Sequence, residues 1–547
     1  MPPRGLPGNA NLEQLKNGAK SFQRAVRAGD TGAAEVVREF HPRLGQAQPG
    51  SPELAAFKLA DAQLVVARSF GFPSWARLKA YVELTPRYSR SPHAQPIGEP
   101  IRDEQGLVNE FLRLACLNYG EDDPGRWARA RELLAANPEL ATATIHTIAA
   151  VGEVDAARKL LDRDSEAANR QGGPHDWEPL LYLTYSRLGA TGPGRDALEA
   201  ARVLVDHGAD PNAGYLWEGL SPPFTVLTGA FGSGEGDPPP HADDLALARL
   251  LLEAGADPND EQTLYNRHWD GDDRWLELLL EFGLGTGDGG RWRRLLAPVH
   301  ASPPQLLDEQ LTAAARAGFA GHVRLLLDHG ADPEARGTRN HAYATRTPRE
   351  EAMLRGYREC AELLRAAGAT SGATLLYAFL QAATEGNRDL VQRLLADDPT
   401  LTDQAIALHP DQLVRAAQRN SVEAVALLIE LGFDVNATNR LERYHESAPL
   451  HEAAAHGNLP MIELLLAHGA DPNLRDPSYD STPAGWAEHS ARRKPSATSR
   501  PGRRERASGP AQHDNRAGAA GPCRVRRVWA RVTRHGPGNP RPLSQYA

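Results

Sequence analysis

Two glycine-rich segments of this chain have spacings like those of nucleotide-binding loops. Residues 285–290 read GTGDGG and satisfy the pattern GxGxxG, and residues 189–196 read GATGPGRD. A dinucleotide-binding loop needs a strand before its glycines, but GTGDGG follows the helix-like run RWLELLLEFGL. GATGPGRD lacks the GK[ST] ending of a phosphate-binding loop. We interpret the first segment as a turn that matches the pattern by chance and the second as an insertion between two helices.

Histidine and aspartate side chains gather at two places in the sequence where they could ligate a metal ion. The groups are His445, His451 and His456, and Asp270, Asp272 and Asp273. The sequence contains no HExxH, CxxC, GxSxG or EF-hand loop, and Cys116, Cys360 and Cys523 lie far apart. We therefore expect no catalytic, cofactor-binding or metal site. The separated cysteines indicate a reducing compartment, the cytoplasm.

A recurring phrase marks the elements that position these residues. It reads HGADPN at 207–212, AGADPN at 254–259, HGADPE at 329–334 and HGADPN at 468–473, each time after a Leu-rich run. A phrase that recurs at intervals of tens of residues is typical of stacked repeats, none of which buries its apolar face alone. His207, His329 and His468 precede the capping glycine, where a cation near a helix end is favourable without any ligand.

One repeat is clearest at residues 448–473, APLHEAAAHGNLPMIELLLAHGADPN. Pro449 suits the first position of a short helix, which ends at Gly457 and Asn458. The apolar residues from Met461 to Leu466 then predict a second, antiparallel helix. Gly469 suits a left-handed cap, and the Asp-Pro pair after it favours a tight turn before the next repeat.

This pattern resembles the ankyrin repeat, with its T-P-L-H-x-A signature and a period of about 33 residues. The resemblance is close at 448–473, good at 311–335 and looser at 144–169, 373–403 and 413–438, and Thr482-Pro483 opens a truncated last unit. It implies an all-α fold: an ankyrin-type α-solenoid of about ten helix–turn–helix repeats, elongated in solution, with a small helical N-terminal domain. Segments such as LADAQLVVARSFGFPSWARLKAYVE are similar to uncharacterised bacterial ankyrin-repeat proteins, which implies binding rather than catalysis.

Composition and charge support this organisation. The longest apolar stretches, such as 375–380, are too short to cross a bilayer, and the N-terminus lacks the apolar run of a signal peptide. Residues 491–547 carry 14 Lys/Arg against 2 Asp/Glu, whereas residues 1–490 carry 47 against 68, a net charge of −21. An acidic body of this kind repels nucleic acid along most of its surface. We expect a monomer with protein partners, no membrane contact and no cofactor.

Sequence patterns divide the chain into five parts. We expect a disordered start at 1–10, a helical capping domain at 11–84, a linker at 85–105, the repeat array at 106–490 and a disordered basic tail at 491–547. Ser74 is the expected N-cap of the last helix in the capping domain. Residues 67–82 also have helix-turn-helix spacing, but Arg77 and Lys79 are the only cations of the second helix. Packing as a cap against the first repeat explains the same residues.

The candidate partner-binding residues lie on a long insertion and on the turn after it. The insertion, 213–242, carries aromatic side chains among glycines and prolines. The candidates are Tyr215, Trp217, Phe224, Phe231, Tyr265, Arg267 and Trp269. Alternatively, Trp217 and Phe224 fill a gap between two imperfect repeats, because aromatic side chains serve cores and interfaces alike.

Two classes of function therefore stay open. The first is a non-catalytic scaffold that binds proteins through its concave face and inter-repeat loops. The second is a regulator that contacts nucleic acid through residues 67–82 or through the Arg-rich tail. A steep loss of affinity with salt distinguishes the second class from the first.

The tail begins inside a repeat. The unit that opens STPAGWAEHS should continue with a Leu-rich helix, but the chain continues as ARRKPSATSRPGRRERASGP. A gene read in a shifted frame produces such a change, and we prefer that interpretation over a genuine basic arm. Translation of the coding DNA in the other two frames from codon 488 tests it, since one frame should restore an apolar helix and a Gly-Ala-Asp turn.

Overall fold

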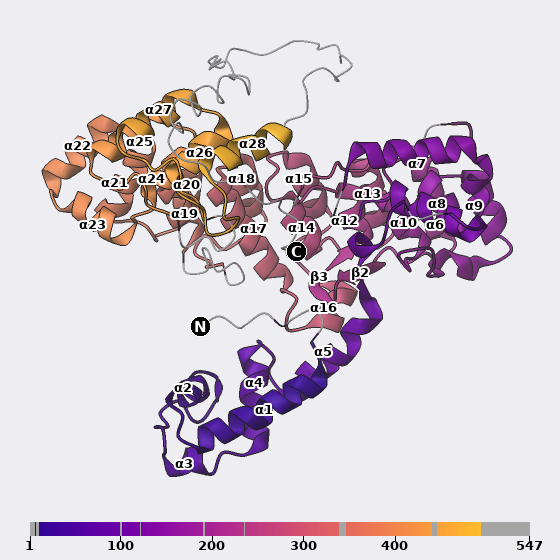
Figure 1. Ribbon diagram of the computed structural model, residues 1–547, viewed down its shortest axis with the longest axis horizontal. Coiled ribbons are helices and arrows are strands. Elements are labelled where there is room, and N and C mark those ends of the chain that lie inside the picture. The colour runs from indigo at the N-terminus through magenta and orange to yellow at the C-terminus, as the bar shows by residue number, and fades with distance from the viewer. Residues whose placement is uncertain are drawn as a thin grey trace. The chain divides into compact units, whose positions relative to one another are not determined.

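The computed structural model describes residues 6, 10–98, 101–120, 122–189, 192–234, 236–337, 346–439 and 446–493. The chain divides into a first unit, Met1–Gln310 with Arg324–Ala331, and a second unit, Leu311–Val323 with Asp332–Ala547. Figure 1 shows the helices of both units. His445, Cys523, the basic tail from residue 494 onward and most of residues 1–10 lie outside the described residues.

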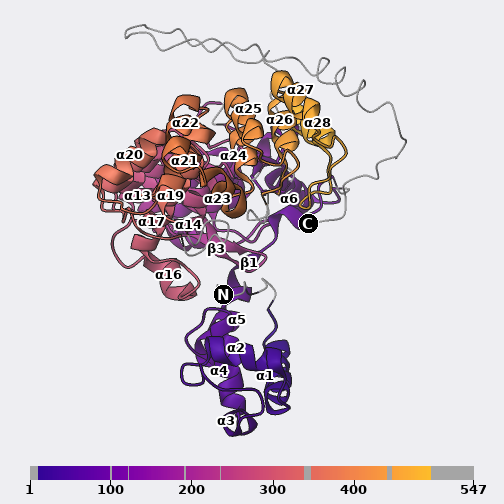
Figure 2. The same ribbon diagram turned by 90° about the vertical axis from the view of Figure 1, so that its left-hand side faces the viewer.

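The first unit begins with a group of short helices, which Figures 1 and 2 show side by side. They are α1 (Leu12–Arg27), α2 (Thr31–Phe40), α3 (Pro52–Ala55), α4 (Leu59–Ser69) and α5 (Trp75–Tyr88). Polar N-caps start most of them, and the Ser74 hydroxyl accepts a hydrogen bond from the Arg77 N–H at 3.3 Å, which confirms Ser74 as the cap of α5. Val26, Val37, Leu54 and Phe57 are fully or almost fully buried and hold α1 to α4 together.

The expected linker at 85–105 begins as regular structure. Helix α5 continues through Tyr88, and Ser89–Arg90 form strand β1. The extension has a packing cause, because the apolar side of α5 continues from Leu78 and Tyr81 to Tyr88, whose ring lies 5.1 Å from the Trp292 ring. The capping domain is thus joined to the repeats by packing and by a strand.

Helix pairs follow, and they stack in two rows within the first unit. The pairs are α6 (Glu104–Ala115) with α7 (Pro124–Ala136), α8 (Ile145–Val151) with α9 (Val154–Leu161), α10 (Pro179–Tyr185) with α11 (Ala197–Asp206), α12 (Val226–Phe231) with α13 (Asp244–Glu253), and α14 (Glu261–Arg267) with α15 (Asp273–Glu281). First helices contact first helices in the order α6, α8, α10, α12, α14, and second helices contact second helices from α9 to α15. Short 3-10 helices, η1 (Pro92–Ala94), η2 (Pro138–Thr142) and η3 (Ser165–Asn169), lie before and between them.

Burial explains why neighbouring repeats depend on one another. Every residue of α8, α10 and α12 is buried, because each first helix is covered by its neighbours in the row and by its own second helix. The second helices are amphipathic, and in α9 only Ala157 and Leu161 are buried. No single pair could therefore bury its first helix alone, which is the property of a repeat solenoid.

The insertion at 213–242 contains strands that the all-α prediction did not include. Strand β2 (Gly214–Trp217) pairs antiparallel with β3 (Leu220–Thr225) and parallel with β1, in the order β1-β2-β3. Glu218 and Gly219 both have positive φ, the geometry of a two-residue hairpin turn. Thr225 then caps α12, so the hairpin is a finger that precedes the pair α12/α13.

Helices α16 (Gly290–Leu296), α17 (Pro303–Ala317) and α18 (Ala320–Asp328) follow. Trp292 and Leu296 of α16 pack with Leu78 and Tyr81 of α5 and with Leu216 of β2. The capping domain therefore packs against the finger and α16.

The second unit continues the same architecture. Its helices are α19 (Pro348–Leu354) with α20 (Arg358–Ala366), α21 (Leu375–Thr384) with α22 (Arg388–Asp397), α23 (Leu401–Leu408), α24 (Gln412–Gln418) with α25 (Val422–Glu430), α26 (Pro449–His456) with α27 (Leu459–Ala467), and α28 (Pro483–Arg493). Figure 2 shows α22, α25 and α27 in a row above α21, α24 and α26. One apolar cluster runs from Phe379 through Leu428 to Leu465. The single helix α28 covers α26, with the Trp486 ring 5.5 Å from the His451 ring.

An asparagine at the end of the turn joins two consecutive repeats at Asn212, in the recurring phrase, and at Asn436, in the related run GFDVN. Asn212 donates from Nδ2 to the Gly255 carbonyl at 2.9 Å and accepts at Oδ1 from the Asp257 N–H at 2.9 Å. Asn436 makes the equivalent bonds to Gly469 and Asp471, at 3.1 and 2.8 Å. In both cases the Gly that ends the helix has a positive φ, as expected of a left-handed cap.

The histidine of the phrase also has a structural partner. The Nδ1 atoms of His207, His329 and His468 lie 2.8, 2.8 and 2.9 Å from the carbonyl four residues earlier. Hydrogen bonds to Val203 and Asp162 raise the pKa of His207, which favours a cation at this helix end. These histidines therefore serve the turns, as the sequence predicts.

Candidate functional site

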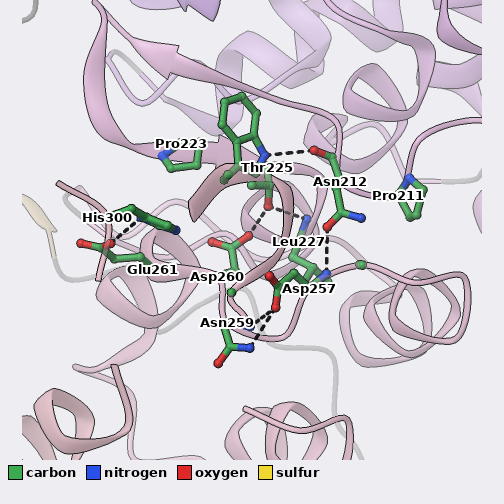
Figure 3. A pocket seen from close by; sticks show the side chains of 13 residues that line it. Pro211, Asn212, Pro223, Thr225, Leu227, Asp257, Asn259, Asp260, Glu261 and His300 are labelled. Carbon is green, nitrogen blue, oxygen red and sulfur yellow. Dashed lines mark hydrogen bonds and ion pairs between the residues drawn. The ribbon is translucent and has the colours of Figure 1, made fainter. Parts of the chain in front are cut away.

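The first unit holds a small polar cavity at the base of the finger (Figure 3). The Thr225 hydroxyl donates a hydrogen bond to the carboxylate of Asp260, which also accepts one from the Thr263 N–H at 2.9 Å. Desolvation raises the pKa of the buried Asp260 carboxyl to about 6. Asp260 is also the N-cap of α14, so this carboxylate links two consecutive first helices.

Other polar side chains of the cavity wall are also paired with groups of the same chain. His300 Nδ1 lies 2.6 Å from Glu261 Oε2, and Trp292 Nε1 donates to the Asn212 carbonyl at 3.0 Å. The cavity measures about 20 Å³, which is room for a water molecule and far less than the hundreds of Å³ of a metabolite pocket. The polar residues that line this cavity therefore connect neighbouring repeats and do not form a substrate site.

The structure separates the predicted partner-binding residues into three groups by their exposure: buried, partly buried and exposed. Tyr215 and Phe231 are buried, 2% and 0% exposed, and cannot contact a partner in the folded chain. Tyr215 stacks against Trp177, with ring centroids 5.1 Å apart, and against Phe224 at 5.6 Å. The prediction that these two residues form a surface is corrected, because Tyr215 is buried on strand β2 and Phe231 is the last residue of helix α12, whose residues are all buried.

Trp217 and Phe224 form the second group and are partly buried. The indole of Trp217 stacks on the His93 ring with centroids 4.1 Å apart, and Phe224 lies 5.0 Å from Tyr119. His93 belongs to η1, a part of the chain that the sequence assigns to a linker. This packing favours the alternative in which Trp217 and Phe224 fill a gap.

Arg267 is buried too, and its role is to position the turn around it. Its guanidinium lies over the rings of Phe231 and Trp275, 5.8 and 5.9 Å from their centroids, and pairs with Asp270 at 2.6 Å. A guanidinium held on two aromatic faces and one carboxylate gives a rigid support to the residues on either side of it.

Tyr265 and Trp269 lie at the end of α14 and are exposed, by 44% and 60%. The ring of His268 lies between them in sequence and in space, 5.3 Å from the Tyr265 ring and 4.0 Å from the Trp269 ring. We call Tyr265, His268 and Trp269 the aromatic patch. Large aromatic side chains on a rigid turn suit a protein interface, because little side-chain entropy is lost when they are covered.

A loop that sequence reasoning missed lies across the first helices of this unit. We call residues 115–120 the crossing loop. The Leu117 N–H donates to the Tyr185 carbonyl and the Arg187 N–H donates to the Ala115 carbonyl, both at 2.9 Å. The Tyr119 hydroxyl contacts the Thr228 carbonyl and accepts a hydrogen bond from Asn266 Nδ2 at 3.2 Å. Burial raises the pKa of Tyr119.

The crossing loop therefore touches α10, α12 and α14, at Tyr185, Thr228 and Asn266. These are the helices that line the concave face of a repeat stack. Part of that face in the first unit is thus taken by the chain itself. The only sequence signal was an aromatic residue in a loop, LNYGEDD, where the repeat pattern asks for none.

The residues considered for nucleotide or metal binding make hydrogen bonds and ion pairs within the chain. The GTGDGG segment lies between α15 and α16, and the Gly285 N–H donates to Asn259 Oδ1 at 2.8 Å, which makes it another inter-repeat turn. Asp272 pairs with Arg274. His451 Nδ1 accepts from the Ala448 N–H at 3.2 Å, and its Nε2 lies 3.2 Å from the Ser481 carbonyl. In the described part of the chain no three His, Cys, Asp or Glu residues are placed to hold a metal ion.

The two described cysteines are not reactive thiols. Cys116 and Cys360 are free and buried, and desolvation raises the pKa of each to about 12.

Helix α5, the second helix of the helix-turn-helix spacing, packs with one side against the finger and α16. Its buried residues Leu78, Tyr81 and Val82 pack against Leu216 and Trp292, and Lys79 pairs with Glu83 at 3.6 Å. A recognition helix must present one free face to a major groove. The packing of α5 leaves a face with few cations, which weighs against the nucleic-acid alternative.

Comparison with known proteins bears on the stacked helix pairs. The family model for ankyrin repeats, three copies, matches residues 379–476, which cover α21 to α27. The chain contains ankyrin repeats. The stacked pairs, the capped Gly-Ala-Asp turns and this match together establish a helical ankyrin-repeat solenoid, a fold that serves in general as a protein-interaction module.

Curated relatives share parts of this chain. It is 29% identical over 183 residues to Ankyrin repeat and KH domain-containing protein mask-1 of Caenorhabditis elegans, a match that covers 33% of this chain and 6% of the relative. It is 38% identical over 99 residues to E3 ubiquitin-protein ligase KEG of Arabidopsis thaliana, covering 17% and 6%. It is 44% identical over 71 residues to Cyclin-dependent kinase 4 inhibitor B of Bos taurus, covering 13% and 50%.

These matches span half or less of each relative's length. The named relatives are eukaryotic and do not support the bacterial origin suggested by the sequence. A crystal structure of the human ASB11 ankyrin repeat domain is 20% identical and covers 43% of this chain and 99% of that one, with a TM-score of 0.19. None of the described helices is long and apolar enough to span a membrane.

Proposed function

We propose that this ankyrin-repeat protein is a non-catalytic scaffold that binds a protein partner through the aromatic patch. One observation carries the proposal: Tyr265 and Trp269 are exposed at the end of a helix whose other side is fixed by buried Arg267. The other aromatic candidates are buried or packed against the chain. A rigid turn with exposed aromatic side chains is what a binding hot spot requires.

The location of the patch refines the expectation of a concave binding face. Because the crossing loop occupies part of the first-helix row, the turn between α14 and α15 is the better-exposed surface in the first unit. We propose further that the protein acts as a monomer in a reducing compartment, the cytoplasm. The buried free thiols Cys116 and Cys360 support the reducing compartment, since neither is placed to form a disulfide.

Quantitative capture from native lysate tests the proposal. The full chain is immobilised and compared with the double variant Tyr265→Ala/Trp269→Ala. The matched control is Tyr479→Ala, which removes a tyrosine of similar exposure, 52%, from the second unit. We expect at least one protein whose recovery falls about tenfold or more with the double variant and stays unchanged with the control. A protein profile that is the same for all three chains would refute this function.

A further inference from the structure

We propose that the aromatic patch recognises a cationic segment, a stretch of the partner protein rich in arginine or lysine. This inference rests on the function proposed above and adds the chemistry of the partner. It follows from two independent features, the charges around the patch and the exposed Trp269 indole, over which no cation of the described residues lies.

Carboxylates are concentrated in the turn that carries the patch, and the charge of Asp244 also acts on Arg274 in that turn. Residues 268–274 read HWDGDDR and hold three aspartates against one arginine. Asp243 and Asp244 stand at the start of α13, the second helix of the preceding pair. Desolvation and the nearby charges of Asp196 and Asp244 raise the pKa of Asp243, which shows that carboxylates crowd this end of the helices.

Several of these carboxylates have structural tasks and still keep exposed oxygens. Asp272 caps α15 and pairs with Arg274, which lowers the pKa of Asp272 to about 2. Asp270 pairs with Arg267, and its side chain is 37% exposed. The carboxylates are Asp243, Asp244, Asp270, Asp272 and Asp273. Their sum with Arg267 and Arg274 is negative, which attracts a cation and repels an acidic segment.

Trp269 presents an exposed indole face. Elsewhere the chain places guanidinium groups over its aromatic rings: Arg249 over Phe282, Arg291 over Tyr88 and Trp292, and Arg419 over Tyr357. Arg267 faces Phe231 and Trp275, on the buried side of the same turn. Among the described residues no guanidinium or ammonium group lies over the Trp269 ring. A partner's cation can take that place, with the aspartates beside it.

An alternating peptide of stated charge is the probe. Fluorescein-labelled (Arg-Ala)6, (Gln-Ala)6 and (Glu-Ala)6 are titrated with the full chain at about 50 mM and about 500 mM salt, and Kd is read from anisotropy. We expect (Arg-Ala)6 to bind at least about tenfold more tightly than (Gln-Ala)6 at low salt, and (Glu-Ala)6 not to bind.

Variants of Trp269 separate the indole face from simple charge attraction. Trp269→Leu keeps an apolar side chain and removes the ring, so we expect Kd for (Arg-Ala)6 to rise about tenfold. Trp269→Phe keeps a ring, and the rise should stay below about threefold. The pair Asp243→Asn/Asp244→Asn should weaken binding at low salt and have less effect at high salt. Tyr479→Ala serves again as control, and thermal unfolding verifies that each variant is folded.

Each outcome decides the proposal. If (Arg-Ala)6 binds no better than (Gln-Ala)6, the cationic inference is wrong. If Trp269→Leu binds (Arg-Ala)6 as the parent chain does, the inference is wrong as well, because the acidity of the chain alone then explains the binding. The proposed function is tested separately. If the double variant Tyr265→Ala/Trp269→Ala still captures less of a lysate protein than the parent chain does, the proposed function stands even when the cationic inference is wrong. If that loss is absent as well, both proposals fall together.

Discussion

The side chain of Asn436 fixes the position of Asp471 in the following repeat. The Asp471 N–H donates to Asn436 Oδ1 at 2.8 Å while Asn436 Nδ2 donates to the carbonyl of Gly469. Asn212 has the same relation to Asp257 and Gly255 in the first unit. An amide that both donates and accepts across the boundary holds two consecutive turns together by two hydrogen bonds, in addition to the apolar packing behind them.

We expect Asn436→Ala to lower the free energy of unfolding by about 1–2 kcal/mol, because two hydrogen bonds between repeats are lost. Urea denaturation followed by circular dichroism measures it. Asn473→Ala is the matched control, since Asn473 holds the same place in the last full repeat and is exposed. Its effect should stay within about 0.5 kcal/mol. Equal effects of the two substitutions would show that the bridge contributes nothing.

Two tryptophans of the first unit should respond oppositely to truncation. Trp217→Ala removes an indole that stacks on His93 and packs against Phe224 in a tilted arrangement, and we expect a loss of about 2 kcal/mol of stability with little change in partner capture. Trp269→Ala removes an exposed indole and should leave stability within about 0.5 kcal/mol while capture falls. Denaturation and capture on both variants test the pair of expectations. The reverse pattern would place the binding surface on the finger.

The crossing loop should stabilise the first unit through Tyr119. We expect Tyr119→Phe to lose about 1 kcal/mol, since the hydroxyl bond to Asn266 disappears, and Tyr119→Ala about 2 kcal/mol or more. Proteolysis under native conditions gives a second readout, because a released loop should be cleaved within residues 115–123. If Tyr119→Ala is neither less stable nor cleaved faster, the contacts of the crossing loop do not stabilise the first unit.

The buried carboxyl of Asp260 gives the first unit a defined dependence on pH. Its pKa is raised from 3.8 to about 6 on folding, mainly by desolvation. Below pH about 4 the group is protonated in both states, and between about 4 and 6 only the unfolded state releases the proton. Stability from this group is therefore lost as pH rises through that window, by up to about 3 kcal/mol.

Asp260→Asn tests this dependence, because the amide keeps an oxygen for the Thr263 N–H and cannot ionise. The difference in unfolding free energy between Asp260→Asn and the parent chain should grow in favour of the variant from pH 4 to pH 7. Other titrating groups contribute equally to both chains and cancel. A difference that does not change with pH would mean that Asp260 folds with an ordinary pKa.

The repeats could be predicted from sequence because their signals are local. The Gly at the end of each second helix, the histidine before it and the Asp-Pro after it act within a few residues of one another, and the structure places them as expected. His451, which the sequence places in one of the two possible metal-ligating groups, lies 3.2 Å from the Ser481 carbonyl and so connects two turns. Such features depend on backbone geometry that neighbouring residues decide by themselves.

Tyr215 and Tyr119 could not be placed in the same way. The hairpin turn is Glu218-Gly219 rather than the Asn-Gly or Asp-Gly pair that marks such turns, so its strands gave no clear signal. The contact of Tyr119 with Asn266 joins residues 147 positions apart. No periodicity in the sequence reports such a contact, since it depends on how several repeats stack.

The crossing loop changes how the first unit comes apart. An ordinary repeat array melts from its ends, because each repeat touches only its neighbours and can fray without disturbing distant ones. Here Tyr119 ties the first helix pair to the fifth, so α14 cannot fray inward without releasing a residue near the start of the array. The first unit should consequently lose its structure in one cooperative step, with amide hydrogens of α8 and α12 exchanging together, while the second unit keeps the graded protection of a simple stack.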